Sequence, residues 1–438
     1  MRAVEHIVCG DYVLVMDGPL TVIEDGAVVV DGGLVVEAGG RREVLARYSS
    51  PHVAEGRGKA VLPGLVNTHT HAAMTLLRGM ADDLPLMEWL EKHVWPAEEK
   101  WLAPEFIADG VALACAEMLK AGITLYNDMY FFEETAARTA RDMGMRAVLG
   151  SGIVDFPTKV TSGADDCLRK AEEFLRNFGG DPMITPCVAP HAVYTCSPET
   201  LRKAKALADR YGSRVHIHLA ETEGEVKDSK AKFGKGPVEL LEEIGFLDER
   251  VLAAHCVWLS EGEIEVLARR GVSVSHCPES NLKLASGIAP VPAMLKAGVK
   301  VSLGTDGAAS NNDLNILSEM STAAKLHKAV SGDPTVLDAR TVLLMATRWG
   351  AEALGLGGVC GSLEPGRAAD ITVMDLGRPH LTPLYNIYSQ LVYSARASDV
   401  SAVMVGGRYV VSEGNLLTAR EDEIMERAGA WARKVKAP

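Results

Sequence analysis

Long apolar runs are absent from this sequence. A helix that crosses a membrane needs about 18 or more consecutive apolar residues, and no such run occurs among the 438 residues. The first residues, MRAVEHIVCGDYVL, also lack the cationic and then apolar pattern of a secretion signal. Both absences predict a cytoplasmic protein without a membrane partner.

Positive charge is in deficit. The chain carries 45 Lys and Arg against 58 Asp and Glu, a formal net charge of −13 at pH 7. Because nucleic-acid phosphates and anionic lipid surfaces attract basic proteins, this balance predicts that neither is a partner.

Paired cysteine motifs are absent as well. The eight cysteines are scattered, with no CxxC pair and no short regular spacing: Cys9, Cys115, Cys167, Cys187, Cys196, Cys256, Cys277 and Cys360. In a long chain without a secretion signal, this pattern favours buried, reduced thiols over a disulfide framework.

Both ends of the chain read as β structure. Residues 1–58 alternate short Val- and Ile-rich runs with Gly and Asp turns, which is typical of antiparallel strands. The same texture returns in Ala369–Asp375 and Ala402–Val411. Because neither end has enough strands for a sandwich alone, we predict one composite β-sandwich domain from residues 1–58 and 366–438, with a C-terminal helix.

The centre, residues 59–365, alternates short apolar strands with longer helical patterns. Eight candidate strands can be counted: Ala60–Asn67, Thr124–Met129, Arg146–Gly150, Ile184–Ala189, Arg214–His218, Val251–His255, Val272–His276 and Lys300–Thr305. Eight parallel strands, each followed by a helix, close into a (β/α)8 TIM-like barrel, an α/β fold. Its catalytic groups come from the C-terminal ends of the strands.

Histidines gather at those predicted ends. His69 and His71 end the first strand, and because alternate residues of a strand share a face, they can share one ion. Further polar residues end the fifth to eighth strands: His218, His255, His276 and Asp306. Each histidine alone would be expected as a core or loop residue. Together, three imidazoles and a carboxylate around one mouth match a metal site with an open position for water.

Several motifs are long and specific: PGLVNTHTH (63–71), HLAET (218–222), AAHCVWL (253–259), SHCPESNLKLASGIAP (275–290), LGTDGAASNN (303–312) and GSLEPGRAADITVMD (361–375). With them the chain resembles the amidohydrolase superfamily, and within it the adenosine-type aminohydrolases. The resemblance implies one divalent metal, with zinc as the expected ion, held by His69, His71, His218 and Asp306. Binuclear relatives bridge two metals with a carboxylated lysine on the fourth strand, and Ile184–Ala189 contains no lysine.

The resemblance also implies roles in catalysis. A bound metal lowers the pKa of its water to about 7, Asp306 would accept the water proton, and His255 would orient the hydroxide. Glu221 would protonate the ring nitrogen beside the attacked carbon and then the departing ammonia. The His-x-Glu and Pro-Cys-x-x-Cys signature of cytidine-type deaminases is absent.

The segment after the first strand, Met74–Glu99, resembles that of deaminases acting on methylthioadenosine and S-adenosylhomocysteine. The resemblance implies that Trp89 packs on a nucleoside, that Glu98 binds its ribose hydroxyls and that His191 contacts the purine. Glu98 could instead be a solvated helix carboxylate, and Trp89 could be ordinary core.

Homologues that accept S-adenosylhomocysteine hold its carboxylate with arginines after the third strand. No arginine occurs between Arg146 and Arg169. Because guanidinium suits bidentate carboxylate binding, the sequence favours uncharged 5′ groups, as in 5′-methylthioadenosine, adenosine or 5′-deoxyadenosine.

Alternatives remain open at this stage. Another hydrolase of the same barrel could act on guanine, a triazine or a cyclic amide, and a silent scaffold could keep the fold for binding. The intact set of candidate catalytic residues argues against silence. Ser310, Asn281 and His276 receive no role, His216 is expected inside the barrel, and the number of subunits stays open, a homo-oligomer included.

Overall fold

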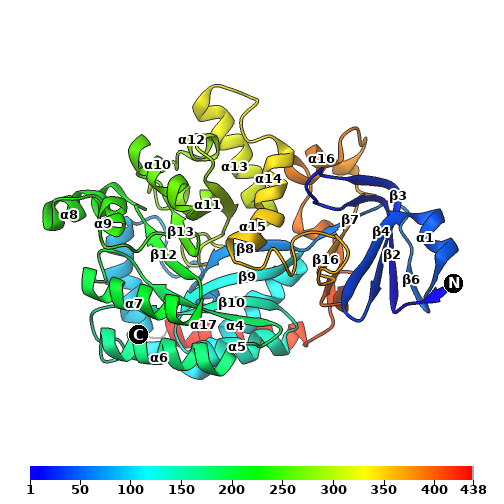
Figure 1. Ribbon diagram of the computed structural model, residues 1–438. Helices are drawn as coiled ribbons and strands as arrows, with labels where there is room; N and C mark the ends of the chain where they lie inside the picture. Colours follow the sequence, from blue (N-terminus) through cyan, green and yellow to red (C-terminus); the bar gives the residue numbers. More distant parts are fainter. Residues whose placement is uncertain (437–438) are drawn as a thin grey trace.

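A computed structural model describes residues 1–436, and a parallel barrel dominates it (Figure 1). Eight parallel strands neighbour one another in chain order: β8 (Leu65–Thr70), β9 (Ile123–Tyr130), β10 (Arg146–Ile153), β11 (Ile184–Pro190), β12 (Val215–Leu219), β13 (Val251–His255), β14 (Ser273–His276) and β15 (Lys300–Leu303). Helices follow the strands and surround them. The predicted (β/α)8 barrel is confirmed.

The last barrel strand meets the first through a few specific hydrogen bonds. Thr68 Oγ1 donates to the carbonyl of Leu303 at 2.8 Å. The carbonyl of His69 accepts from the backbone N–H groups of Thr305, at 3.1 Å, and Asp306, at 2.9 Å. This closure brings His69 and Asp306, which are more than 200 residues apart, to the same point of the barrel mouth.

The helices differ in length and in place. Around the barrel lie α4 (Pro104–Lys120), α5 (Glu133–Asp142), α6 (Ala164–Phe178), α7 (Pro198–Tyr211), α8 (Glu223–Phe233), α9 (Pro237–Glu243), α10 (Glu261–Arg270), α11 (Pro278–Lys283), α12 (Val291–Lys296), α13 (Ile316–Ser331), α14 (Ala339–Met345) and α15 (Arg348–Ala353). Short turns of helix between β8 and α4 include α2 (Leu86–Trp89) and α3 (Trp95–Trp101). Elsewhere lie α1 (Arg41–Arg47), α16 (Ile387–Tyr393) and α17 (Glu421–Lys436).

The two chain ends build a second sheet beside the barrel (Figure 1). Its N-terminal strands are β2 (His6–Leu14), β3 (Val22–Asp31), β4 (Leu34–Gly40), β6 (His52–Ala54) and β7 (Lys59–Pro63), and its C-terminal strands are β16 (Ile371–Asp375), β17 (Val400–Val405), β18 (Arg408–Ser412) and β19 (Asn415–Leu416). The two sets join where β7 pairs antiparallel with β16. Buried residues of both sets pack in one cluster, among them Val30, Val61, Ile371 and Met404. The prediction that the ends form one composite β unit is confirmed.

The first predicted strand was wrong in its extent. The sequence predicted one strand over Ala60–Asn67, but β7 belongs to the terminal sheet and only β8 to the barrel. The chain crosses between them at Gly64, whose N–H donates to Asp370 at 2.9 Å. A Cβ on Gly64 would lie 1.9 Å from Thr124 Oγ1. Apolar sequence runs on through the crossing, so periodicity alone could not reveal it.

Substituting Gly64→Ala should destabilise the protein. The added methyl group would collide with the buried Thr124, and we expect a loss of about 1–3 kcal/mol, the usual cost of overpacking. Gly262→Ala on α10 is the matched control, because its Cβ would meet nothing within 4 Å and alanine favours a helix. Thermal unfolding of both variants measures the effect, and an unchanged midpoint for Gly64→Ala would contradict it.

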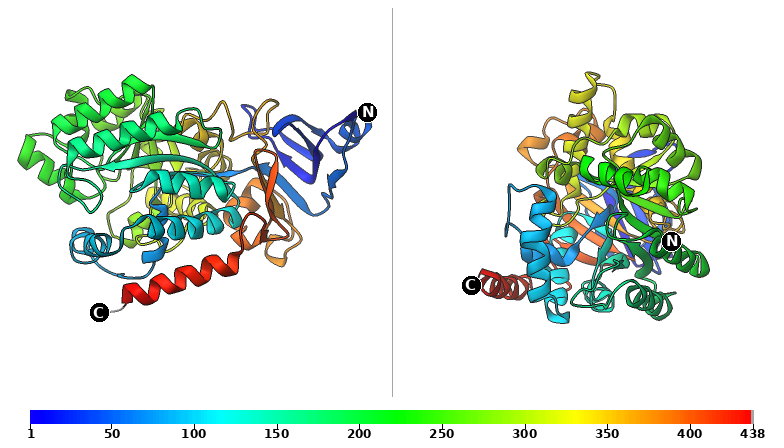
Figure 2. Two further views of the ribbon diagram at one scale, coloured as in Figure 1. Left: turned by 90° about the horizontal axis from the view of Figure 1, so that it is seen from below. Right: turned by 90° about the vertical axis from the view of Figure 1, so that its left-hand side faces the viewer.

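The C-terminal helix lies on the barrel and not on the terminal sheet. Figure 2 shows α17 running beneath the barrel. Trp431 Nε1 donates to Asp109 Oδ2 on α4 at 2.8 Å, and the Trp431 ring meets the Phe106 ring edge-on, with centroids 5.2 Å apart. The sequence predicted this helix as part of the β-sandwich domain, but in the structure it packs on the barrel helix α4.

Two smaller expectations can be compared with the structure. All eight cysteines are buried and unpaired, as the sequence predicted. Within residues 1–436, no helix combines the length and apolar character that a membrane span requires.

Candidate functional site

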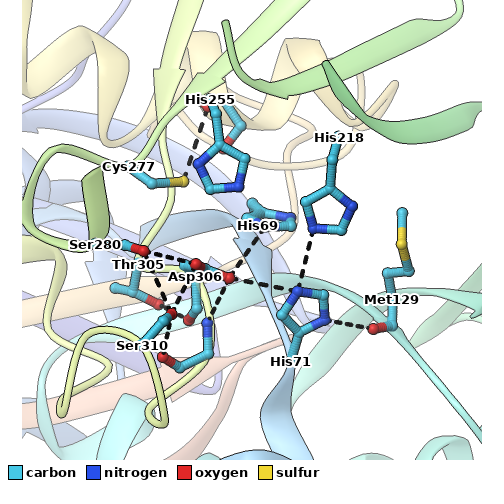
Figure 3. Close-up of polar contacts among 12 residues, drawn as sticks. His69, His71, Met129, His218, His255, Cys277, Ser280, Thr305, Asp306 and Ser310 are labelled. Atoms are coloured by element: carbon cyan, nitrogen blue, oxygen red, sulfur yellow. Dashed lines mark hydrogen bonds and ion pairs between the residues drawn. The ribbon is translucent and has the colours of Figure 1, made fainter. Parts of the chain in front are cut away.

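Three histidines and an aspartate converge at the mouth of the barrel (Figure 3). The Nε2 atoms of His69 and His71 each lie 3.3 Å from Asp306 Oδ1. His218 Nε2 lies 3.3 Å from His71 Nε2. The four side chains come from the ends of β8 and β12 and from the loop after β15, and the structure brings them together as the sequence predicted.

Backbone carbonyls set the protonation of two of these rings. His71 Nδ1–H donates to the carbonyl of Met129 at 2.6 Å, and His218 Nδ1–H donates to the carbonyl of His191 at 2.8 Å. Because a carbonyl can only accept, each Nδ1 carries a hydrogen, so the neutral form of each ring keeps its lone pair on Nε2. Such partners commonly orient metal-binding imidazoles.

The third ring, His69, is fully buried. Its Nδ1 lies 2.8 Å from His216 Nε2, so His216 contacts the site from inside the barrel, as expected. Its Nε2 has no hydrogen-bond partner among residues 1–436. Burial lowers the pKa of His69 to about 4 despite the opposing effect of Asp306, so the ring is neutral at pH 7. An orphaned nitrogen beside two aligned lone pairs and a carboxylate fits a divalent ion.

The Asp306 carboxylate is held on both oxygens. Oδ2 accepts hydrogen bonds from the hydroxyls of Ser280 and Ser310, each at 2.7 Å, and Oδ1 accepts from the N–H of Gly307 at 2.8 Å. Burial opposes ionisation, but the imidazole of His69, whose Nε2 lies 3.3 Å from Oδ1, and those of His255 and His71 hold the pKa of Asp306 well below its usual range. The group is therefore an oriented carboxylate at neutral pH.

Left-handed backbone marks the ends of several of these strands. Ala220, His255 and Asp306 have φ angles of 49°, 71° and 63°. Such conformations cost non-glycine residues about 1–3 kcal/mol each and persist where the surrounding structure enforces them. Here they follow β12, end β13 and follow β15, where each bends the chain at the mouth of the barrel.

His255 and Glu221 form a second pair beside the metal cluster. His255 Nε2 lies 4.0 Å from Glu221 Oε2, and His255 Nδ1 donates to Asn281 Oδ1 at 2.9 Å. Burial raises the pKa of Glu221, and the charge of His255 only partly opposes this. A carboxyl group that holds its proton more readily than usual is suited to proton transfer near neutral pH.

One pocket connects this mouth with the residues expected to bind substrate. Its lining includes the candidate metal ligands His71, His218 and Asp306 and the candidate proton shuttle Glu221. All three expected substrate contacts line it as well: Trp89, Glu98 and His191. Much of the remaining lining is apolar, including Leu86, Val94, Phe131, Val154 and Phe156. An apolar pocket with a few convergent polar groups is the usual form of a small-molecule site.

Glu98 faces this pocket. Tyr130 Oη donates to Glu98 Oε1 at 2.6 Å, which leaves Oε2 without a hydrogen-bond partner among residues 1–436. Burial raises the pKa of Glu98 to about 7, although Tyr130 opposes the shift. The alternative of a fully solvated helix carboxylate does not describe this residue.

The other two expected contacts have structural tasks as well. Trp89 is buried and packs in the main core while its side chain also lines the pocket, so both interpretations of it hold. The His191 ring centroid lies 4.7 Å from that of His218, and its Nδ1 lies 3.0 Å from Thr195 Oγ1.

Comparison with known proteins decides the family. A family model described as "Amidohydrolase family" matches residues 60–410. The chain belongs to the amidohydrolase family. It is 52% identical to a 5-methylthioadenosine/S-adenosylhomocysteine deaminase of Thermodesulfovibrio yellowstonii, over 98% of both chains. It is also 46% identical to a 5′-deoxyadenosine deaminase of Methanosarcina acetivorans, again over 98% of both.

A solved structure resembles this amidohydrolase over its whole length. It is an adenosine deaminase from Xanthomonas campestris with bound zinc, with a TM-score of 0.98 and 42% identity over 99% of both chains. Family membership makes the protein a metal-dependent hydrolase. Within the described residues, both groups of three or more candidate metal ligands include His69.

Sequence reasoning missed several residues of the amidohydrolase site. Tyr130, the last residue of β9, could have been found because active-site groups lie at strand ends. Lys159 also lines the pocket, and its Nζ donates to the carbonyl of Lys100 at 2.9 Å. No sequence signal marked this loop lysine, whose neighbours along the chain are neutral.

One strand-end histidine does not join the cluster. His276 ends β14, but its Nε2 lies 3.0 Å from His327 Nε2 on α13, on the helix side of the strand. The sequence assigned His276 no role, and in the structure it pairs with His327 outside the metal cluster. Asn281 and Ser310, which had no assigned role, instead contact His255 and Asp306.

Proposed function

We propose that this amidohydrolase removes ammonia from an adenosine-type nucleoside with an uncharged 5′ group, such as 5′-methylthioadenosine, adenosine or 5′-deoxyadenosine, and yields the inosine analogue. The observation that carries the proposal is the shared pocket, which Glu98, Trp89, Glu221 and Asp306 all line. The names of the relatives agree with this substrate class.

The residues that would hold the metal are His69, His71, His218 and Asp306. Zinc is the proposed ion, because the ligands are neutral imidazoles and a carboxylate and because a similar structure contains zinc. When bound, one divalent ion supplies an acidified water. No lysine occurs on β11, which supports a single ion.

Two side chains of the protein then move protons and a third orients the attacking oxygen. Asp306, held on both oxygens, takes the proton of the attacking water, and His255 orients that oxygen through Nε2 because its Nδ1 is occupied by Asn281. Glu221 delivers a proton to the ring nitrogen next to the attacked carbon. As the carbon–nitrogen bond breaks, the amine leaves as ammonia with a proton returned through Glu221, and a 6-oxo purine remains.

The pocket wall would select the nucleoside. The free Oε2 of Glu98 can accept hydrogen bonds from ribose hydroxyls, Trp89 can pack on the ring system, and His191 can contact the purine. Beyond them, Phe156 and Pro157 present an apolar surface to the 5′ group. Lys159 is the nearby cation, and its hydrogen bond to Lys100 occupies one of its three donors.

Glu98→Gln should raise the KM for ribonucleosides by about tenfold, since one charge-assisted hydrogen bond contributes about 1.5–3 kcal/mol. In the wild type, KM should also rise as the pH falls below about 7, the raised pKa of Glu98, because protonation removes an acceptor. Steady-state kinetics at several pH values measure both effects. With 2′,3′-dideoxyadenosine, which lacks the hydroxyls, the variant and the wild type should have equal KM; a difference that persists there would remove Glu98 from ribose binding.

An ultraviolet absorbance screen tests the activity itself. Adenosine, 5′-methylthioadenosine, 5′-deoxyadenosine, S-adenosylhomocysteine and guanine are offered to the metal-loaded enzyme, and conversion to the 6-oxo product is expected for the first three. Turnover of guanine alone would favour the alternative function, that of another hydrolase of the same barrel. No turnover of any nucleoside would overturn the proposal.

A further inference from the structure

Glu319 is a buried carboxyl group behind the mouth of the barrel, and burial raises its pKa well above the usual value. It lies in the first turn of α13 and has 0% of its surface exposed. Among residues 1–436, no lysine, arginine or histidine forms an ion pair with Glu319. Removing a polar group from water costs free energy unless hydrogen bonds compensate it, so the hydrogen bonds of Glu319 are informative.

Its two oxygens reach two different active-site loops. Oε1 accepts from Asn311 Nδ2 at 2.6 Å, in the loop after β15. Oε2 accepts from the backbone N–H of Glu279 at 3.2 Å, in the first turn of α11 after β14. One side chain therefore joins the seventh and eighth loops of the barrel.

We call the hydrogen bonds of Glu319 to Asn311 and to Glu279 its two arms. Each arm reaches a residue that is adjacent in the sequence to a serine that orients Asp306. Ser280 follows Glu279, Ser310 precedes Asn311, and both serine hydroxyls donate to Asp306 Oδ2. The hydroxyl of Ser280 also lies 3.3 Å from that of Ser310, so the two loops touch above the carboxylate.

The same arms extend to two further points. Asn311 Nδ2 also donates to the carbonyl of Thr305 at 2.8 Å, directly before Asp306. On the other side, Asn281 in α11 accepts from His255 Nδ1. Displacing either loop would move Asp306 and His255 relative to each other.

We propose that Glu319 is a positioning residue for the reaction, which clamps the seventh and eighth loops so that Asp306 and His255 keep their mutual geometry. The inference rests on the proposed deamination for its kinetic test. A misplacement of about 1 Å caused by a change far from the chemistry can cost roughly 100-fold in rate. Residues expected to bind the nucleoside lie on other loops, so binding should be spared.

The test is Glu319→Gln. Both oxygens of the glutamate side chain accept a hydrogen bond, whereas an amide offers one acceptor and turns its NH2 toward the other donor. One arm is lost in either orientation. We expect kcat to fall about 100-fold with KM for the nucleoside within about twofold and the metal content unchanged.

Thr322→Val is the matched control. Thr322 lies one turn further along α13 and donates to the Glu279 side chain at 2.6 Å, so the variant weakens the same helix contact while both arms of Glu319 remain. We expect its kcat to stay within about twofold of the wild type. If Glu319→Gln lowers only the unfolding temperature and leaves kcat unchanged, Glu319 is merely structural and the proposal is overturned.

Two additions keep the result decisive. If Glu319→Gln does not fold, Asn311→Ala removes one arm from a partly exposed position, and a lower kcat at constant KM supports the clamp while an unchanged kcat refutes it.

If the wild type deaminates no nucleoside, visible spectra of the cobalt-loaded proteins still report the ligand geometry. A band shift in Glu319→Gln but not in Thr322→Val supports the clamp, and identical spectra overturn it.

Discussion

Glu221→Gln should bind a full equivalent of metal and lose about 10²–10⁴-fold in kcat, the usual contribution of a positioned acid–base group. Glutamine has the same shape and can still accept a hydrogen bond, but it cannot carry a proton to the ring nitrogen. Burial raises the pKa of the natural carboxyl group, so the wild type can hold the proton that the variant lacks. Steady-state kinetics measure kcat, and elemental analysis measures the metal content.

Glu223→Gln is the control for this experiment. Glu223 lies two residues further on, in the first turn of α8, where its exposed side chain pairs with Lys227. The control removes a carboxylate from the same segment without touching the pocket, and its kcat should equal that of the wild type. Turnover retained by Glu221→Gln would assign the proton transfer to another group, with His255 as the nearest one.

Replacing His69 by alanine should reduce the metal content from one equivalent to nearly none. The ring contributes a fully buried nitrogen without a hydrogen-bond partner in residues 1–436, and its removal leaves two imidazoles and one carboxylate, with a gap on the side of β8. Loss of the metal also removes binding free energy from the folded state. A chelator should therefore lower the unfolding temperature of the wild type and leave that of His69→Ala unchanged.

His276→Gln is a well-matched control for the metal assignment. Both histidines are buried at the ends of barrel strands, but His276 contacts His327 and lies outside the cluster. The control should keep one equivalent of metal by elemental analysis, even if its stability falls. A full metal complement in His69→Ala, or an equal loss in both variants, would contradict the proposed ligand set.

Much of the architecture could be predicted from local pattern. Alternating strand and helix textures predicted eight barrel strands, and β13 was predicted with its observed bounds, Val251–His255. The error at Gly64 arose because an apolar run looks the same whether it lies in one sheet or passes between two. What requires a glycine at the crossing is the close approach of Thr124, a residue 60 positions away.

The candidate site divides in the same way. Strand ends predicted His69, His71, His218 and Asp306 because the barrel places those ends at one mouth. His276 also lies at a strand end but received no role, and the structure turns it toward α13. A strand-end position determines where a side chain starts, whereas its direction depends on the last backbone angles and on the neighbours it packs against.

The sequence by itself determined the kind of fold, the family and the residues that could hold a metal, because these follow from periodicity and from motifs of adjacent residues. Only the tertiary structure decided how those residues are held. They are held by hydrogen bonds to groups elsewhere in the sequence: the carbonyls of Met129 and His191 and the hydroxyls of Ser280 and Ser310. The side chain of Glu319 binds the loop that follows Asp306. Hydrogen bonds of this kind require the barrel to be closed first, and no local pattern in a sequence records them.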